Sequence, residues 1–369
     1  MIDARWTYQP DAVSPPGETL LDLLEERGLT QKELALRMGR PLKTINEIVK
    51  GKAAITKETS LELEKVLGTP ADFWLRREAR YREYLARVEE QKNAARWLPW
   101  LERLPVKELM QHGALPKLRL AGENKKQVLL AALRFFGVAS PEGWERVYAE
   151  PQVSYRRTRA DQSDTGAIAA WLRLGEIQAE KVACEKYSRA RFQKALETAR
   201  SLTVLDPEEF EPKLHELCAW AGVALVLVPA IPRAHVSGVS RWLGTHKPLL
   251  QLSLYGKTND RFWFTFFHEA AHILLHDKNE VFLDEFTGEV LQSRQEEEAN
   301  AFAARFLIPE KSEAELPCLK SKRAVIDFAR RLGIHPGIVV GRLQHDQHIL
   351  VTWMNDLKVS FRWREDGER

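Results

Sequence analysis

Residues 264–276 constrain this chain more than any other segment, because they carry the pattern HExxH within an apolar run. His268 and His272 are four residues apart, so on a helix both imidazoles project from one face and can reach a single metal ion. Glu269 lies beside them, where a carboxylate can take a proton from water. Hydrolytic zinc sites use three protein ligands and leave a fourth position open. The segment therefore predicts a zinc hydrolase whose third ligand comes from elsewhere in the chain.

The third ligand is expected in residues 295–309, where apolar spacing predicts a second helix that stops at Pro309. The face expected to pack on the metal helix consists of Ala299, Phe302, Ala303 and Phe306. Three acids precede it: Glu296, Glu297 and Glu298. Glu296 is favoured as the ligand because it lies one turn before Ala299, whereas the other two are expected on a solvated face. Asn300 is expected to hydrogen-bond the second ring nitrogen of a histidine ligand.

HExxH together with the downstream pattern ExxANxFAxxFLIP resembles the ImmA/IrrE family of zinc metallopeptidases. The resemblance implies a small thermolysin-like domain in which His268, His272 and Glu296 hold zinc and Glu269 is the general base. The second motif has Asn where thermolysin-like enzymes commonly carry Asp, a form that this family accepts. His276 lies one further turn along, at a spacing unlike that of metzincins, and we interpret it as a packed histidine rather than a ligand.

Three short runs rich in β-branched and apolar residues precede the metal helix, at 223–229, 235–242 and 248–255. Pro and Gly separate them, so they predict a small antiparallel sheet. An extended peptide substrate would add to the edge of this sheet through main-chain hydrogen bonds. His235 and Tyr255 are candidates for oxyanion stabilisation, but an ordinary structural role is the preferred interpretation for both.

The amino end carries three helical segments separated by glycines, at 17–28, 30–39 and 42–51. Thr30 followed by Glu33 indicates a capping box at the start of the second segment. The apolar residues of the third segment are expected to form a buried stripe: Leu42, Ile45, Ile48 and Val49. Two short helices joined by a glycine-containing turn make up the helix-turn-helix layout, in which the second helix of the pair enters the major groove of DNA.

The residues expected to contact DNA are Gln31, Lys43, Thr44, Asn46, Glu47 and Lys50. Gln31 would contact a phosphate, and Asn46 would hydrogen-bond an adenine. Positive charge along the phosphate backbone would come from Lys32, Arg37, Arg40, Lys43, Lys50 and Lys52. The segment resembles XRE-type DNA-binding domains and is especially similar to the HigA antitoxin branch, which implies operator binding. A helical module that contacts only proteins is the alternative.

The whole chain has 369 residues, which is long enough for two or three domains. Its net charge of +3 is too small to imply nucleic-acid binding by itself, so the basic character must act locally, in the helix-turn-helix segment. We expect a helix-turn-helix domain at 1–75, a helical linker and middle region at 76–222, a peptidase core at 223–316 and a helical tail at 317–369. The expected fold class is mainly α with a small antiparallel sheet: a helix-turn-helix bundle plus a thermolysin-like (gluzincin) metallopeptidase domain.

The location and partners of the chain follow from the same sequence. No apolar run is long enough to span a bilayer, and the start lacks the apolar stretch of a signal peptide, so we expect a cytoplasmic protein without a membrane partner. The cysteines, Cys184, Cys218 and Cys318, show no CxxC pairing, which argues against a disulfide framework or a cysteine zinc site.

Joined on one chain, the two motifs predict a DNA-binding regulator with a zinc endopeptidase. In the ImmA/IrrE family the peptidase typically cleaves a repressor, so a specific regulatory protein is the expected substrate. The alternative is a HigA-like antitoxin or autorepressor whose peptidase fold senses or binds a partner with little hydrolysis. Both hypotheses predict operator DNA, a protein partner and a homodimer that reads two half-sites.

Overall fold

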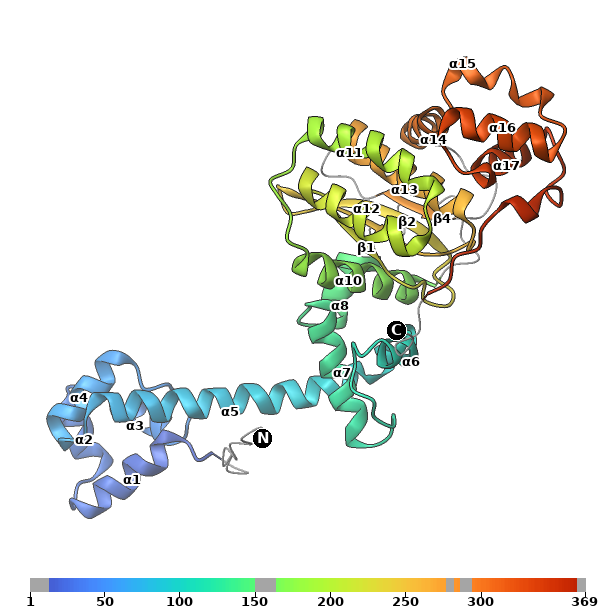
Figure 1. The fold of residues 1–369 in the computed structure, drawn as a ribbon. Helices are drawn as coiled ribbons and strands as arrows, with labels where there is room; N and C mark the ends of the chain where they lie inside the picture. Colours follow the sequence, from blue (N-terminus) through green and yellow to red (C-terminus); the bar gives the residue numbers. More distant parts are fainter. Residues whose placement is uncertain (1–12, 150–163, 277–281, 286–293, 364–369) are drawn as a thin grey trace. The chain divides into compact units, whose positions relative to one another are not determined.

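The computed structural model describes residues 13–149, 164–276, 282–285 and 294–363, and its contacts divide the chain into two compact units, residues 1–98 and 99–369 (Figure 1). The described chain is mainly helical with one small sheet, so the predicted fold class is confirmed. The finer domain boundaries drawn from the sequence stay predictions.

The first unit is a helical bundle followed by a long helix. Its elements are α1 (Pro16–Glu26), α2 (Gln31–Met38), α3 (Leu42–Val49), α4 (Lys57–Leu67) and α5 (Ala71–Trp97). Its buried core takes side chains from every one of these helices, including Leu20, Leu34, Ile45, Leu63 and Trp74. The three helices expected from the sequence are therefore present.

One residue of the stripe predicted to be buried on α3 is exposed instead. Ile45 and Ile48 are buried and Val49 packs partly against the core, but Leu42 is 41% exposed. Leu42 is the first residue of the helix, directly after Pro41. Leu42 shares the helical face of Ile45, but no earlier turn of the helix lies beside it, so the end of the stripe stays exposed.

The capping box at the start of α2 is formed as predicted. The Thr30 hydroxyl accepts a hydrogen bond from the Glu33 backbone N–H at 3.2 Å, and the Glu33 carboxylate accepts one from the Thr30 N–H at 2.8 Å. Two N–H groups that the helix itself leaves without acceptors are thereby satisfied. Gly39 then ends the helix with φ of 65°, a left-handed conformation that glycine adopts without strain.

Replacing Thr30 with Ala is expected to destabilise the first unit by about 1 kcal/mol, because it removes this cap. Hydrogen exchange followed by mass spectrometry on the full chain measures the effect as faster exchange of the α2 amides. Peptides from the second unit serve as the internal control, since the substitution leaves them untouched. Unchanged exchange in α2 would show that the capping box contributes nothing to the helix.

The second unit begins with a helical region. Its helices are α6 (Val106–Gln111), α7 (Glu123–Phe136), α8 (Pro141–Trp144), α10 (Thr165–Lys181), α11 (Arg189–Ser201) and α12 (Pro207–Ala221). An aromatic cluster fills the interior of its first part, where Trp144 makes edge contacts with Trp100 and Phe136 at centroid distances of 5.9 and 6.0 Å. This region therefore has a packed core of its own.

The sheet of the second unit has the strand order β1-β3-β2-β4. Its strands are β1 (Ala224–Leu227), β2 (Val236–Leu243), β3 (Lys247–Leu252) and β4 (Phe282–Glu285). The three runs expected from the sequence form β1, β2 and β3. The sheet is mixed rather than purely antiparallel, because β1 pairs with β3 in parallel while β2 is antiparallel to both of its neighbours. A short apolar run does not encode the direction of its pairing partner, and β4 was not predicted.

Helices cover both faces of this sheet, and Figure 1 shows the layers. On one face α10 is tied to the strands by side-chain hydrogen bonds: Gln251 Nε2 donates to the Trp171 carbonyl at 2.7 Å, and Trp171 Nε1 donates to the Val228 carbonyl at 3.1 Å. Gly175 allows this close approach, because a Cβ there would lie 1.8 Å from Gln251 Oε1. These contacts hold α10 on the face of the sheet opposite the one that carries the HExxH helix.

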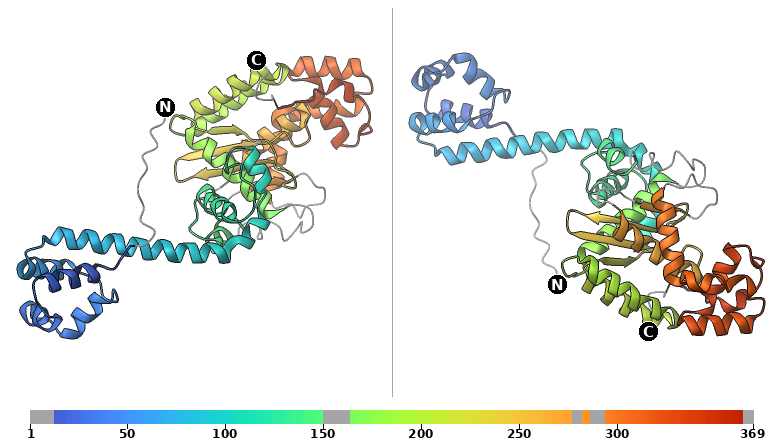
Figure 2. Two further views of the ribbon diagram at one scale, coloured as in Figure 1. Left: turned by 90° about the horizontal axis from the view of Figure 1, so that it is seen from below. Right: turned by 90° about the horizontal axis from the view of Figure 1, so that it is seen from above.

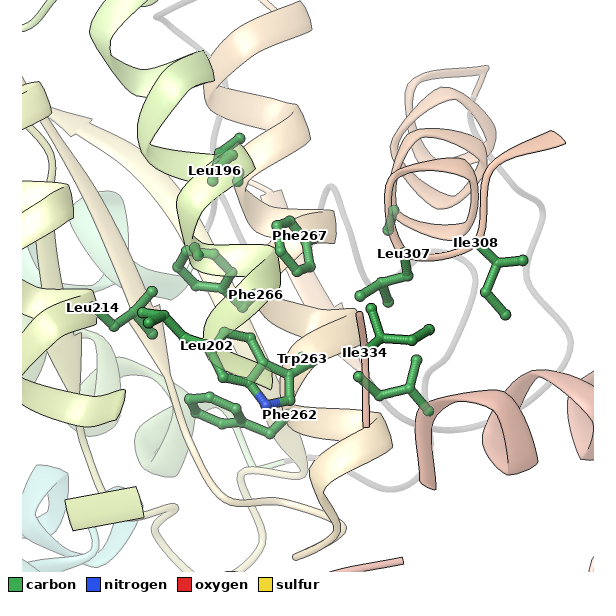
Figure 3. Close-up of a cluster of buried hydrophobic side chains, with 14 of the residues drawn as sticks. Leu196, Leu202, Leu214, Phe262, Trp263, Phe266, Phe267, Leu307, Ile308 and Ile334 are labelled. Atoms are coloured by element: carbon green, nitrogen blue, oxygen red, sulfur yellow. The ribbon is translucent and has the colours of Figure 1, made fainter. Parts of the chain in front are cut away.

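The opposite face carries α11, α12 and α13 (Asn259–Leu275). Figure 3 shows the apolar cluster between them, in which Trp263, Phe266 and Phe267 of α13 meet Leu196 and Leu214 of the flanking helices. A helix that is apolar on nearly all sides needs such complete cover. Every residue from 265 to 274 is buried, so α13 is the central element of the unit.

The C-terminal helices gather at one end of the second unit, as the views in Figure 2 show. They are α14 (Arg294–Leu307), α15 (Glu310–Glu313), α16 (Lys322–Leu332) and α17 (Pro336–His345). Arg200 of α11 fixes two of them, donating to the Phe306 and Leu307 carbonyls at 2.9 Å and to the Leu332 carbonyl at 2.8 Å. Carbonyls at a helix end lack donors within the helix, so this guanidinium anchors the ends of α14 and α16.

Candidate metal centre

The HExxH residues lie in the second half of α13. His268, Glu269 and His272 are all buried, and the Nε2 atoms of the two histidines are 3.1 Å apart. This is the convergence that the i, i+4 spacing predicts for two imidazoles on one helical face. The two ring nitrogens therefore point at a common position.

α14 brings the third group. Glu296, in its first turn, places Oε2 at 3.2 Å from His268 Nε2 and Oε1 at 3.5 Å from His272 Nε2. Ala299 and Ala303 are buried against α13, and the small side chains let the two helices approach closely. One donor atom from each of His268, His272 and Glu296 falls within 4.8 Å of the others. Of the three acids considered from the sequence, Glu296 is the one that lies against His268 and His272.

The donor set fits a zinc ion. Two imidazole nitrogens and one carboxylate oxygen form a three-ligand set that leaves a coordination position open. Burial, with the nearby His268 and His276 rings, lowers the pKa of His272 to about 2. The His272 ring is therefore neutral at neutral pH, which is the form that binds metal ions.

Asn300 lies where the sequence placed it, beside the second ring nitrogen of a histidine. Its Oδ1 is 3.0 Å from His268 Nδ1. An amide oxygen only accepts, so a proton on Nδ1 donates to it, and the lone pair on Nε2 is left pointing toward Glu296. This bond sets both the tautomer and the ring orientation that a metal ligand needs.

Glu269 lies against the sheet. A Cβ at Gly238 of β2 would lie 2.8 Å from Glu269 Oε1 and 2.7 Å from Thr265 Cγ2. The register of β2 against β4 also shifts between Val236 and Gly238. A glycine at this point of the strand therefore provides the space that the Glu269 carboxylate occupies.

His235 and Tyr255 are brought together at the start of β2. His235 Nδ1 is 3.0 Å from the Tyr255 hydroxyl, and His235 has a positive φ of 50°. Each side chain thus has a polar contact with the other, which agrees with the structural role preferred from the sequence. Their part in oxyanion stabilisation stays a prediction.

Two residues near the centre were not assigned to it from the sequence. His276 lies 2.9 Å from His272, measured between the Nδ1 atoms, and Glu298 lies 3.4 Å from His276, measured from Oε2 to Nε2. The signal was present, because His276 continues the i+4 spacing of the motif and Glu298 follows Glu296. Glu298, which we expected on a solvated face, is 42% exposed at its side chain and also takes part in this contact.

The predicted DNA-contact residues lie on α2, α3 and the residue that follows α3. Gln31 is the first residue of α2, and Lys43, Thr44, Asn46 and Glu47 lie on α3 with Lys50 directly after it. Lys43 is 85% exposed at its side chain, and its Nζ is 3.9 Å from Glu47. Arg40, expected near phosphates, instead donates two hydrogen bonds to Glu62 of α4. Its charge is partly neutralised inside the bundle.

The fold and the site define two domain classes, and family comparisons agree with them. Residues 20–74 match a helix-turn-helix family model, and residues 231–344 match the Peptidase M78 model described as the IrrE N-terminal-like domain. The chain therefore combines an XRE-type helix-turn-helix DNA-binding domain with an IrrE/ImmA-like, metallopeptidase-type domain.

Other comparisons are more limited. No curated protein matches the chain. A solved structure from Nostoc punctiforme, described as an antidote protein of a plasmid maintenance system, is 24% identical over 22% of this chain and 91% of its own, with a TM-score of 0.22. An addiction module antidote protein of the HigA family from Coxiella burnetii is 28% identical over 23% of this chain and 92% of its own, with a TM-score of 0.21.

Two further expectations from the sequence concern membrane-spanning segments and cysteines. None of the helices in these parts of the chain combines the length and the apolar character needed to cross a membrane. Cys184, Cys218 and Cys318 are free cysteines, and burial raises the pKa of the Cys184 and Cys218 thiols.

Proposed function

We propose that this chain is a DNA-binding transcriptional regulator whose zinc-dependent endopeptidase domain cleaves a specific regulatory protein. The observation that carries the proposal is the convergence of His268, His272 and Glu296 beside the buried Glu269. The helix-turn-helix domain on the same chain supports a regulatory output. A repressor is the substrate class that fits best, since its removal changes transcription directly.

In this proposal, the two histidines and Glu296 hold zinc and Glu269 handles the protons. When bound, zinc supplies Lewis acidity that lowers the pKa of a water and polarises a carbonyl. The Glu269 carboxylate takes the proton of the attacking water and then gives it to the leaving amine. Asn300 keeps the His268 ring in its orientation throughout. The reaction is hydrolysis of one peptide bond.

Strand β4 offers a place for an extended substrate. It pairs with β2 on one side, and in the described sheet it is the last strand in the order. The outer main-chain groups of a last strand are available to an added strand. A peptide added there would lie near β2, the strand that packs against Glu269. Because the peptide would pair as a strand, the site favours an unfolded or extended segment of the substrate.

The cleavage test uses the zinc-loaded full chain and native cell extract. New protein N-termini are enriched and identified by mass spectrometry, with the same protein stripped of zinc by a chelator as the control. The proposal expects one or a few new N-termini, in a DNA-binding or partner protein, that need zinc. Identical N-termini in both samples, with DNA binding intact, would instead favour an antitoxin-like regulator that binds its partner without cutting it.

Replacing Asn46 with Ala is expected to weaken binding to the preferred operator about tenfold, the loss of one base contact, and to leave non-specific binding nearly unchanged. Operators are first selected from genomic fragments, and affinities are then measured at fixed salt. Leu36→Ala is the control, because Leu36 is exposed on α2 and is not among the predicted contacts. An equal loss on specific and non-specific DNA would contradict base reading by Asn46.

We also propose that the chain is a homodimer, for which the selected DNA sites should show two half-sites.

A further inference from the structure

A line of polar contacts leads from the metal centre to the surface. His272 Nδ1 is 2.9 Å from His276 Nδ1, and His276 Nε2 is 3.4 Å from Glu298 Oε2. Arg294 Nε then donates to Glu298 Oε1 at 2.8 Å. The line joins the last turn of α13 to the first turns of α14, the same two helices that supply the three candidate ligands.

Proton positions along this line are set by simple rules. If His272 uses its Nε2 lone pair for a metal, its proton must be on Nδ1, and this N–H donates to His276 Nδ1. His276 then accepts at Nδ1, so its own proton is on Nε2. That N–H points at the Glu298 carboxylate, which only accepts. Each contact is thus a donor meeting an acceptor when His272 is in its metal-binding tautomer.

The burial of these groups makes the contacts matter. The side chains of His272 and His276 are 0% and 3% exposed, so water has little access to their ring nitrogens. A buried polar nitrogen without a hydrogen bond is costly. The Glu298 carboxylate, held by Arg294 at the surface, therefore fixes the His276 ring, and His276 in turn fixes His272.

The arrangement matches that of the other histidine ligand. His268 is oriented by one amide oxygen, Asn300 Oδ1, whereas His272 is oriented by a histidine that is itself held by a carboxylate. Both imidazoles are thus held through Nδ1, with Nε2 turned to the shared position. A histidine whose Nδ1 faces another histidine's Nδ1 is poorly placed to be a ligand itself.

We propose that His276 and Glu298 are positioning residues that hold His272 in the tautomer and orientation required for metal binding. This inference rests on the proposed zinc site and adds to it. It gives a role to the third histidine of the sequence HEAAHILLH and to the third acid of the run Glu296–Glu298.

The test measures zinc affinity of the full chain by competition with a chelator. His276→Phe, which keeps a ring but removes both contacts, is expected to weaken zinc binding about 10- to 100-fold, as does loss of other groups that orient metal ligands. Glu298→Ala is expected to weaken it less, since the first contact survives. His276→Gln, whose amide both accepts and donates, should restore most of the affinity. Glu297→Ala is the matched control, an exposed acid on the same turn, and should leave the affinity unchanged.

Cobalt spectra of the same variants separate positioning from ligation and from stability. With Co²⁺ in place of zinc, the visible bands should keep the intensity typical of an unchanged coordination number in His276→Gln. A change of coordination number in that variant would make His276 a ligand and overturn the inference. Thermal unfolding of the metal-free variants shows whether His276→Phe merely unfolds the site, in which case His276→Gln decides.

The possible failures are distinguishable. A wild-type chain that binds no zinc would overturn the metal site and this inference together. A wild-type chain that binds zinc tightly, with folded His276→Phe and Glu298→Ala binding it equally well, would overturn the positioning role alone.

Discussion

Replacing Glu269 with Gln is expected to lower the rate of peptide-bond hydrolysis by about 10²- to 10⁴-fold, the usual contribution of a general base. The side chain is buried in the space left by Gly238, so the amide, which has nearly the same shape, can occupy the same position. It cannot take a proton from water. Zinc content is expected to stay at the wild-type level, because Glu269 is not among the three converging donors.

The measurement compares initial rates on a peptide library made from a digested proteome, together with bound zinc. Glu297→Gln is the matched control, since it makes the same chemical change on an exposed residue of α14. Full activity in Glu269→Gln would remove this residue from the base role. Loss of zinc together with activity would instead assign Glu269 to holding the metal.

Replacing Gly238 with Ala is expected to lower the rate of peptide-bond hydrolysis about 10²-fold, which is the cost of displacing a reacting group by about 1 Å. The added methyl group would lie 2.8 Å from Glu269 Oε1, closer than such atoms approach. The added methyl group would also lie 2.7 Å from the Thr265 methyl group, so it cannot avoid the carboxylate by shifting toward Thr265. The carboxylate must therefore move, while the histidines on the neighbouring positions of α13 keep their contacts.

Gly238→Ala thus separates catalysis from metal binding in a way that ligand substitutions cannot. Zinc affinity should remain within a few-fold of wild type, and thermal unfolding reports any general loss of stability. Ser237→Ala, on the same strand, adds no atom and is the control. An active Gly238→Ala variant would show that the position of Glu269 is not set by the strand.

The elements with strong local signals could be predicted from the sequence. The capping box at Thr30 and the glycine at position 39 bound α2 as expected, because caps and left-handed glycines act within a few residues. The contacts of Glu296 and Asn300 with the histidines followed from helical spacing on two neighbouring helices. Periodicity identifies which residues share a helical face, and here it was sufficient to predict that Glu296 and Asn300 lie near the histidines.

Properties that depend on distant partners could not be predicted in this way. β1 pairs in parallel with β3 although β2 lies between them in the sequence, and no local pattern encodes which strand becomes the neighbour of β1. The role of His276 depends on a carboxylate from another helix, so the sequence left it as a packed histidine. The hydrogen bonds from Arg40 to Glu62 of α4 also join residues far apart in the sequence, so no local pattern predicted them.

The most direct test of the central claim is the zinc content of the freshly purified full chain, beside His272→Ala and Glu296→Ala. The account predicts about one zinc per chain in the wild type and much less in both variants, because a site with three protein ligands loses most of its affinity when one is removed. A wild-type chain without zinc, even after purification without chelators and reloading, would contradict the account. It would leave a peptidase fold that serves only to bind a partner.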